Sequence, residues 1–338
     1  MKNFILLAAL AVPAVAQTAG RDLPTVNFAG QPVSGPQTAK VTLSFKGIPS
    51  AAAADMQQTA RRLFAATSSL EQLDNVKLVS TLSGGKHRFN GVADPSAFVE
   101  INSTTGDISF SKGFGGYDAE GDTPNLPVGP DAVRRALKHL GDLDLLPGNP
   151  DEVVVEHVGG LRMGAIDEQG STREYDKLTT VHFGRRLGGI PVGGPGSKIT
   201  VQLGKGGELV GLHRRWNELT PVRHAAGDFV KLEEASGRVS EQLASEWNRA
   251  ENIQAGRPEF GFFDDGKGTV EPAWFTQATL NYDAELHTFA KDGEAAPTAL
   301  CVTPALRVSK ADFAQQDRAD AQPTRAKDAE KVQSTDDD

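Results

Sequence analysis

Apolar and polar residues alternate along much of this chain, which is the pattern of β-strands that bury one face. The clearest case is two alternating runs, 199–203 and 209–216, on either side of a glycine-rich turn at 204–207. This arrangement predicts a β-hairpin. Another strand is predicted just before it, at 179–185, followed by a corner that contains Gly188, Gly189 and Pro191.

The same alternation predicts further strands, at 41–45, 76–82, 153–158 and 270–280, and a second hairpin over 98–110 with its turn at 103–107. Helical periodicity predicts three helices, at 51–66, from 130 to about 141, and within 229–249. Pro130 and Asp131 suit the first turn of the second helix. Helices and strands in this order indicate an α+β protein.

The order of these elements predicts five parts. They are a signal peptide at 1–16, a flexible lead-in at 17–39, a first α+β unit at 40–126, a second α+β region at 127–308 with a later helix–strand extension, and a disordered tail at 309–338. The tail is charged and has few large apolar residues. The hairpins at 98–110 and 199–211 resemble each other, which favours a tandem repeat.

The N-terminus predicts export. Lys2 precedes a short apolar run at 4–12, and Ala14-Val15-Ala16 fits a signal-peptidase site. We therefore expect cleavage near Ala16 and a secreted or periplasmic protein. The apolar run is shorter than the roughly 20 residues that span a bilayer, so no membrane insertion is expected.

Charge and cysteine content narrow the possible partners. The formal net charge is -9, which argues against nucleic acid as a partner. Cys301 is the single cysteine, so no intramolecular disulfide can form, and its apolar surroundings predict a buried strand residue. An intermolecular bridge or a reactive thiol is the alternative.

Two histidines are the candidate catalytic or ligand-binding imidazoles. His182 and His213 fall on neighbouring predicted strands, on the face opposite Val181 and Leu212. A solvated sheet face is the structural interpretation of both. Basic residues surround them in sequence and predict a surface for an anionic ligand or a protein carboxylate, through bidentate contacts: Arg185, Arg186, Arg214 and Arg215.

Other chemical motifs are incomplete. No H-x-x-x-H pair or cysteine set indicates a metal site, and no cofactor motif is present. The 264–268 segment lacks the spacing of a calcium loop and predicts a turn. Ser197 lacks the strand–turn–helix context of a nucleophile elbow. Asn102-Ser103-Thr104 is a glycosylation sequon at a predicted turn, which would matter in a eukaryotic source.

A resemblance to a known superfamily rests on a few segments. These are Leu145-Leu146-Pro147 after a helix, Phe183-Gly184-Arg185-Arg186 leading into Gly189-Ile190-Pro191-Val192, and a later strand, Val270-Glu271-Pro272-Ala273-Trp274. Between about 130 and 280 the chain resembles the PepSY and fungalysin/thermolysin-propeptide superfamily. The resemblance implies tandem units of a helix packed on a curled antiparallel sheet, and a role as a propeptide, inhibitor or binding domain. No HExxH helix follows, so inhibition would act in trans.

Two functions remain open. The first is a secreted, noncatalytic protein that binds another protein, such as a protease, through an edge strand or a sheet face. The second is an extracellular enzyme whose site on the sheet face of the second unit draws on His182, His213, Arg185 and Glu271. The absence of a recognisable local catalytic motif favours the binding protein.

Overall fold

A computed structural model of the chain describes residues 25–29, 43–48, 55–66, 77–81, 85–90, 96–112, 114–117, 119–166, 171–248, 250, 252–281 and 298–313. The predicted signal peptide and all but the first residues of the predicted tail lie outside these ranges. No helix of the described residues is long and apolar enough to cross a membrane.

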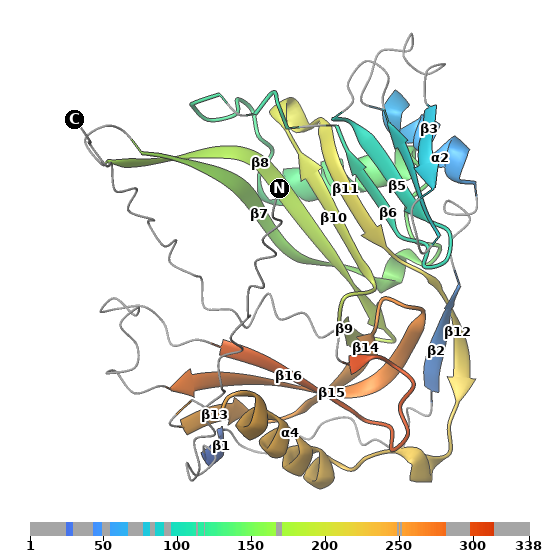
Figure 1. Cartoon of the computed structure of the whole chain (residues 1–338), viewed down its shortest axis with the longest axis vertical. Helices are drawn as coiled ribbons and strands as arrows, with labels where there is room; N and C mark the ends of the chain where they lie inside the picture. The colour runs from blue at the N-terminus through green and yellow to red at the C-terminus, as the bar shows by residue number, and fades with distance from the viewer. Residues whose placement is uncertain are drawn as a thin grey trace, which may run out of the picture.

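Strands dominate the described chain (Figure 1). They are β1 (Thr25–Ala29), β2 (Leu43–Ile48), β3 (Lys77–Thr81), β4 (Lys86–Asn90), β5 (Phe98–Asn102), β6 (Ile108–Ser111), β7 (Val153–Ile166), β8 (Thr172–Leu187), β9 (Ile190–Gly193), β10 (Lys198–Leu203), β11 (Leu209–Arg215), β12 (Glu218–Arg223), β13 (Asn252–Gly256), β14 (Glu259–Asp264), β15 (Thr269–Asn281) and β16 (Thr298–Pro304). The α-helices in these ranges are α2 (Met56–Ala65), α3 (Gly129–Asp142) and α4 (Leu232–Glu246).

All of these strands belong to one hydrogen-bonded, mixed sheet, whose main path runs β1-β13-β15-β14-β9-β8-β10-β11-β6-β5-β4-β3. Most pairs are antiparallel, but β1 with β13 and β14 with β9 are parallel. The predicted fold class, tandem units that each pack a helix on a small curled antiparallel sheet, is therefore wrong. The strands form a single large sheet.

Unpaired backbone groups at strand edges explain the difference. An edge strand leaves a row of N–H and C=O groups without partners, and pairing it with another strand satisfies them. Here β6 pairs with β11, which carries the sheet across the predicted boundary at 126/127. Similarly, β2 pairs with both β12 and β15. Alternation in the sequence shows that a strand exists but does not show which strand it pairs with.

Several elements differ from their predicted extent. β1 lies inside the predicted lead-in and pairs with β13. β7 and β8 continue well beyond the predicted strands and form a long two-stranded ribbon, which projects past the other strands in Figure 1. At the start of the predicted tail, Ser309 Oγ donates a hydrogen bond to Glu271 at 2.5 Å.

The helices cover apolar faces of the sheet. α3 buries Ala132, Ala136 and Leu140, and it packs against β7, β8 and β10. α4 buries Val239 and Leu243 in a second apolar cluster, together with residues of β13, β15 and β16. Burial of such side chains, at about 25 cal/mol per Å² of apolar area, is the main source of stability in a chain without disulfides.

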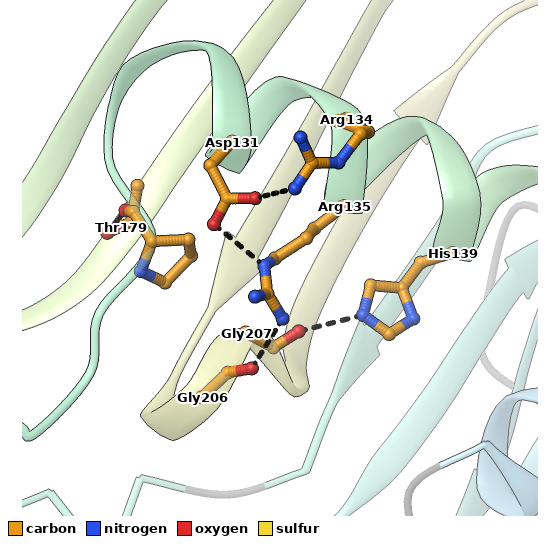
Figure 2. Close-up of polar contacts among 8 residues, drawn as sticks. Asp131, Arg134, Arg135, His139, Thr179, Gly206 and Gly207 are labelled. Atoms are coloured by element: carbon orange, nitrogen blue, oxygen red, sulfur yellow. Dashed lines mark hydrogen bonds and ion pairs between the residues drawn. The ribbon is translucent and has the colours of Figure 1, made fainter.

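Polar contacts fix α3 to the turn between β10 and β11 (Figure 2). Asp131 accepts a hydrogen bond from Arg135 Nε at 2.9 Å, and Arg135 Nη1 donates to the Gly206 carbonyl at 2.8 Å. His139 Nε2 lies 2.9 Å from the Gly207 carbonyl oxygen, one turn further along the helix. The turn is thereby held at a fixed position over the helix.

We expect Gly207→Ala to destabilise the protein more than Gly206→Ala. Both residues have positive φ, 64° for Gly206 and 83° for Gly207, so both substitutions carry backbone strain of about 1 kcal/mol or more. A Cβ on Gly207 would also lie 2.5 Å from Arg135 Cδ, whereas a Cβ on Gly206 would meet no atom within 4 Å. Thermal unfolding of the two variants measures the difference. Equal losses of stability would contradict this account of the turn.

Candidate functional site

Seven polar side chains form a straight row across the sheet, on the face opposite α3. Each lies directly opposite the next in the strand register. We call them the polar row: His157 on β7, His182 on β8, Thr200 on β10, His213 on β11, Ser109 on β6, Glu100 on β5 and Arg88 on β4.

Strand alternation produces this row. On β8, Val181 and Phe183 are fully buried in the core beneath the sheet, so His182 between them points to the other face. On β10, Ile199 and Val201 are buried in the same core, which turns Thr200 outward. Burial of alternate residues in the core thus turns the residues between them to the opposite face.

Neighbouring members of the row make hydrogen bonds and ring contacts. Ser109 Oγ lies 2.8 Å from His213 Nδ1, and Thr200 Oγ1 lies 3.2 Å from His182 Nδ1. The rings of His157 and His182 stack with their centroids 6.0 Å apart. These contacts orient the imidazoles. Further along the row, Arg88 Nη1 donates to Glu100 Oε1 at 3.0 Å.

Two of the imidazoles are shifted toward the neutral form. Burial is the largest cause that lowers the pKa of His182 below 6.5, and the neighbouring His157 adds to the effect. Burial also lowers the pKa of His213, together with the positive charge of Arg215, while Asp107 opposes the shift. Near neutral pH both rings therefore act as hydrogen-bonding groups and potential bases more than as cations.

Two glycines leave room for long side chains that lie flat beside the row. A Cβ on Gly184 would lie 2.0 Å from Glu156 Oε1, and a Cβ on Gly211 would lie 2.1 Å from Gln202 Oε1. Glu156 in turn accepts a hydrogen bond from Lys198 Nζ at 3.2 Å. Glu156 and Gln202 therefore lie close against the backbone of the sheet beside the row.

One end of the row lies on a free sheet edge. β7 is 14 residues long and pairs only with β8 among the described strands. Its exposed apolar residues include Val155 and Leu161, with 47% and 48% of their surfaces accessible. An edge strand with unpaired backbone groups can bind an extended peptide of another chain.

The four arginines predicted to form a binding surface do not lie on one face. Arg185 and Arg214 are 3% and 2% exposed and point into the interior, whereas Arg186 is exposed and Arg215 is half-buried. Arg185 pairs with Glu152 at 2.6 Å, and its guanidinium lies over the Trp216 ring. These contacts give Arg185 a structural role in the core.

Arg214 is held by backbone carbonyls. Its Nε donates to the Leu145 carbonyl and its Nη1 to that of Trp216, both at 3.0 Å. Burial lowers the pKa of Arg214 to about 10, which still leaves it charged at neutral pH. The alternation that placed His213 outward also placed Arg214 inward, so this outcome could have been read from the sequence.

The remaining predicted site residues are separate from the row. Glu271 lies on β15, is 2% exposed, and accepts hydrogen bonds from Ser309 Oγ and the Lys310 amide. β15 pairs with β2, β13, β14 and β16, so Glu271 does not join His182 or His213. The Asn102 side chain is 9% exposed, and its Oδ1 caps the turn by accepting from the Thr104 and Thr105 amides.

The 264–268 segment is a turn, as its sequence predicted. Asp265 Oδ1 accepts hydrogen bonds from the amides of Lys267 and Thr269. Asp264 accepts from Ser197 Oγ at 2.6 Å, and burial raises the pKa of this carboxyl group. In the part of the chain that the structure describes, no group of three or more His, Cys, Asp or Glu residues is arranged to hold a metal ion.

Cys301 is buried on β16, as predicted from its apolar surroundings. Burial, and to a lesser extent Glu246, raises the pKa of its thiol to about 12. The residue is therefore a protonated core side chain at neutral pH and not a nucleophile.

Comparison with known proteins gives no family assignment. No protein-family model and no curated protein matches the chain. A similar solved structure is an uncharacterized protein from Eubacterium rectale, with 11% sequence identity, coverage of 79% of this chain and 84% of that chain, and a TM-score of 0.47. The likeness carries no argument about function.

The sequence indicated two members of the row and missed the other five. His182 and His213 were recognised from alternation. Counting outward from the turn at 204–207 would have placed Thr200 between them, because hairpin register follows from the turn. Ser109 required knowledge that β6 pairs with β11, for which the sequence carries no local signal.

We expect the free energy of unfolding to fall as the pH drops below 6.5. The folded-state pKa values of His182 and His213 are lowered, so below pH 6.5 the unfolded chain binds more protons than the folded protein. The loss continues until the pH passes the folded pKa values, and neither group contributes above pH 6.5. Asp107 has a raised pKa and acts in the opposite sense, from pH 3.8 up to its folded pKa.

Chemical denaturation between pH 5 and 8 measures this dependence. A double variant, His182→Gln with His213→Gln, removes both groups and should flatten the slope between pH 5 and 6.5. If the double variant keeps the slope of the unmodified protein, other groups cause it.

We expect Arg185→Ala to lower the free energy of unfolding by about 3 kcal/mol, because it leaves Glu152 without its buried partner and removes the contact with Trp216. Arg186→Ala is the matched control. Its side chain is exposed, so the change should stay within about 0.5 kcal/mol. Urea denaturation of both variants tests the structural role of Arg185, and equal effects would refute it.

Proposed function

We propose that this protein is a secreted, noncatalytic binding protein that holds a protein partner against the polar row and the neighbouring edge of β7. The observation that carries the proposal is the continuous row itself, seven polar residues in register that end at β7, whose outer edge pairs with no described strand.

The dimensions of the row support a macromolecular partner. Neighbouring strands lie about 4.8 Å apart, so six steps from β7 to β4 span roughly 29 Å. A standard protein interface buries about 800 Å² on each partner, which is a patch of roughly this width. Polar groups spread along a line suit an extended surface, whereas a small molecule needs groups that converge in a pocket.

The β7 edge adds a means of attachment. A partner segment in extended conformation would form main-chain hydrogen bonds with β7 and contact Val155 and Leu161. The rest of the partner would then contact the side chains of the row, beginning with His157. Backbone pairing supplies affinity in this mode, and the side chains supply specificity.

We propose a protease as the most favoured class of partner. The support is the resemblance of the Gly189-Ile190-Pro191-Val192 corner and its hairpin to protease propeptide modules. In this chain the corner contains β9, and Gly188 and Gly189 before it have φ values of 57° and 84°. Binding would block the partner in trans.

One observation favours the alternative, an extracellular enzyme whose site lies on the sheet face. Ser109 Oγ and His213 Nδ1 are 2.8 Å apart, and the lowered pKa of the imidazole keeps it unprotonated at neutral pH, as a general base must be. Asp107 acts electrostatically on the same imidazole. In this alternative Ser109 would be the nucleophile, and its substitution by alanine would abolish turnover.

The test is capture of a partner from the culture fluid of the source organism by mature protein, residues 17–338, with activity assays on the captured protein. We expect a stoichiometric complex, with lower activity if the partner is a protease. Val155→Lys places a charge beside the β7 edge, and Thr200→Lys places one in the centre of the row. Each should weaken binding at least about tenfold, since like or unpaired charges at an interface cost more than 1.4 kcal/mol.

Val128→Lys is the matched control for Val155→Lys. Val128 is 73% exposed and precedes α3, on the other face of the sheet, so its variant should bind as the unmodified protein does. Equal binding by all three variants would refute the proposed surface. Turnover of a substrate that is lost in Ser109→Ala, without any captured partner, would establish the enzyme instead.

A further inference from the structure

A group of buried polar side chains lies under α4, far along the chain from the polar row. Trp274 and Thr276 are on β15, Thr303 is on β16, and Arg257 lies in the short connection between β13 and β14. Trp274, Thr276 and Thr303 are 5%, 1% and 3% exposed.

The polar atoms of this group have no hydrogen-bond partner among the described residues. They are the Trp274 Nε1, Thr276 Oγ1, Thr303 Oγ1 and Arg257 Nη1 atoms, and each is fully enclosed. A buried donor without a partner costs about as much free energy as a lost hydrogen bond, so proteins rarely leave one. Four in one region call for an explanation.

Strand register brings the group together. Trp274 lies directly opposite Thr303, and Thr276 lies two residues along β15 on the same face. Opposite side chains on paired strands have Cβ atoms about 5 Å apart, and diagonal neighbours lie about 7–8 Å apart. The three side chains therefore lie within the length of one small molecule.

Arg257 closes the other side. β13 and β14 pair in turn with β15, Ala255 opposite Ala278 and Glu259 opposite Phe275, so the connection that carries Arg257 lies beside Thr276. Ala255 packs in the apolar cluster under α4, and the Arg257 Nη1 atom, in the connection that follows, is enclosed by protein. Arg257 is partly exposed as a residue, so it links this buried region to the surface.

The chemistry of the four groups indicates the ligand. A guanidinium and an indole N–H only donate hydrogen bonds, and the two hydroxyls donate as well as accept. Arg257 forms no ion pair with a described residue, so one positive charge stands without a carboxylate. A ligand with a single negative charge and two acceptor oxygens matches this set, because guanidinium binds a carboxylate in a bidentate manner.

We propose that Arg257, Trp274, Thr276 and Thr303 form a binding site for the carboxylate group of a small organic acid or of a peptide C-terminus. The guanidinium neutralises the charge, and the indole N–H and the hydroxyls donate to the oxygens. A doubly charged phosphate would leave one buried charge uncompensated and should bind more weakly. The site shares no residue with the polar row, and the proposal stands independently of the binding function above.

The experiment follows the indole N–H signals of the whole mature protein by NMR. The chain contains three tryptophans, so three indole signals are expected, and Trp274→Phe identifies the relevant one. Acetate, N-acetylglycine and phosphate are titrated at constant ionic strength. We expect acetate or N-acetylglycine to shift the Trp274 signal in a saturable manner, and phosphate to do so at least about tenfold more weakly. A stronger response to N-acetylglycine than to acetate indicates a peptide terminus, and the reverse a free acid.

Two pairs of variants test the residues. Thr276→Val removes a hydroxyl with little change in shape, and Arg257→Gln removes the charge. Each should weaken carboxylate binding at least about tenfold. Thr298→Val, at an exposed position on β16, and Arg223→Gln, at an exposed position on β12, are the matched controls and should bind normally. Without carboxylate, Thr276→Val should raise the melting temperature, because it removes an unpaired buried hydroxyl.

Three results would overturn the proposal. The first is a Trp274 signal that no carboxylate moves. The second is a shift that the Arg257 and Thr276 variants retain in full, since binding would then lie elsewhere. The third is equal binding of phosphate and acetate with no dependence on Arg257, which would indicate a general effect of anions.

Discussion

The rest of the fold depends on the backbone pairing of strand β8 with its neighbours. It spans Thr172–Leu187 and pairs with β7 along one edge, and with β10 and then β9 along the other. β9 in turn pairs in parallel with β14, which connects the strands around α3 to those around α4. Backbone donors and acceptors must be paired when buried, and a strand this long carries enough of them to pair with all three neighbours. The ion pair of Arg185 with Glu152 secures its end beneath that sheet.

The two faces of this sheet differ in composition. The core face carries apolar residues such as Val181, Phe183 and Val201, which are fully buried or nearly so. The opposite face carries the polar row, whose members satisfy one another through contacts such as Ser109 with His213. These contacts order the side chains of the row, so a partner bound there, as proposed, would cost less conformational entropy.

The sequence predicted the strands better than their arrangement. Alternation located the hairpin of β10 and β11 and the outward position of His182, because both depend on neighbouring residues alone. It did not predict that β6 joins β11 or that β9 joins β14 in parallel, since these pairs are distant in sequence. The predicted tandem units were wrong for that reason. Arg185 and Arg214 were assigned to a surface from their charge. Each lies two residues after a buried apolar residue of its strand, Phe183 or Leu212, so alternation places both arginines on the buried face.

The buried polar group under α4 could not be predicted from the sequence either. It differs from the polar row because its polar atoms are buried and unpaired. Thr276, Thr303 and Arg257 come from three strand regions that only the register of β15 unites, so no spacing in the sequence points to them. On the exposed face, water satisfies polar side chains at little cost, so their presence alone does not lower stability. In the interior each unpaired donor lowers stability, and a chain that retains several together gains nothing in folding from them. A ligand that supplies the missing acceptors would offset this cost, so binding at this site would also stabilise the strands beneath α4.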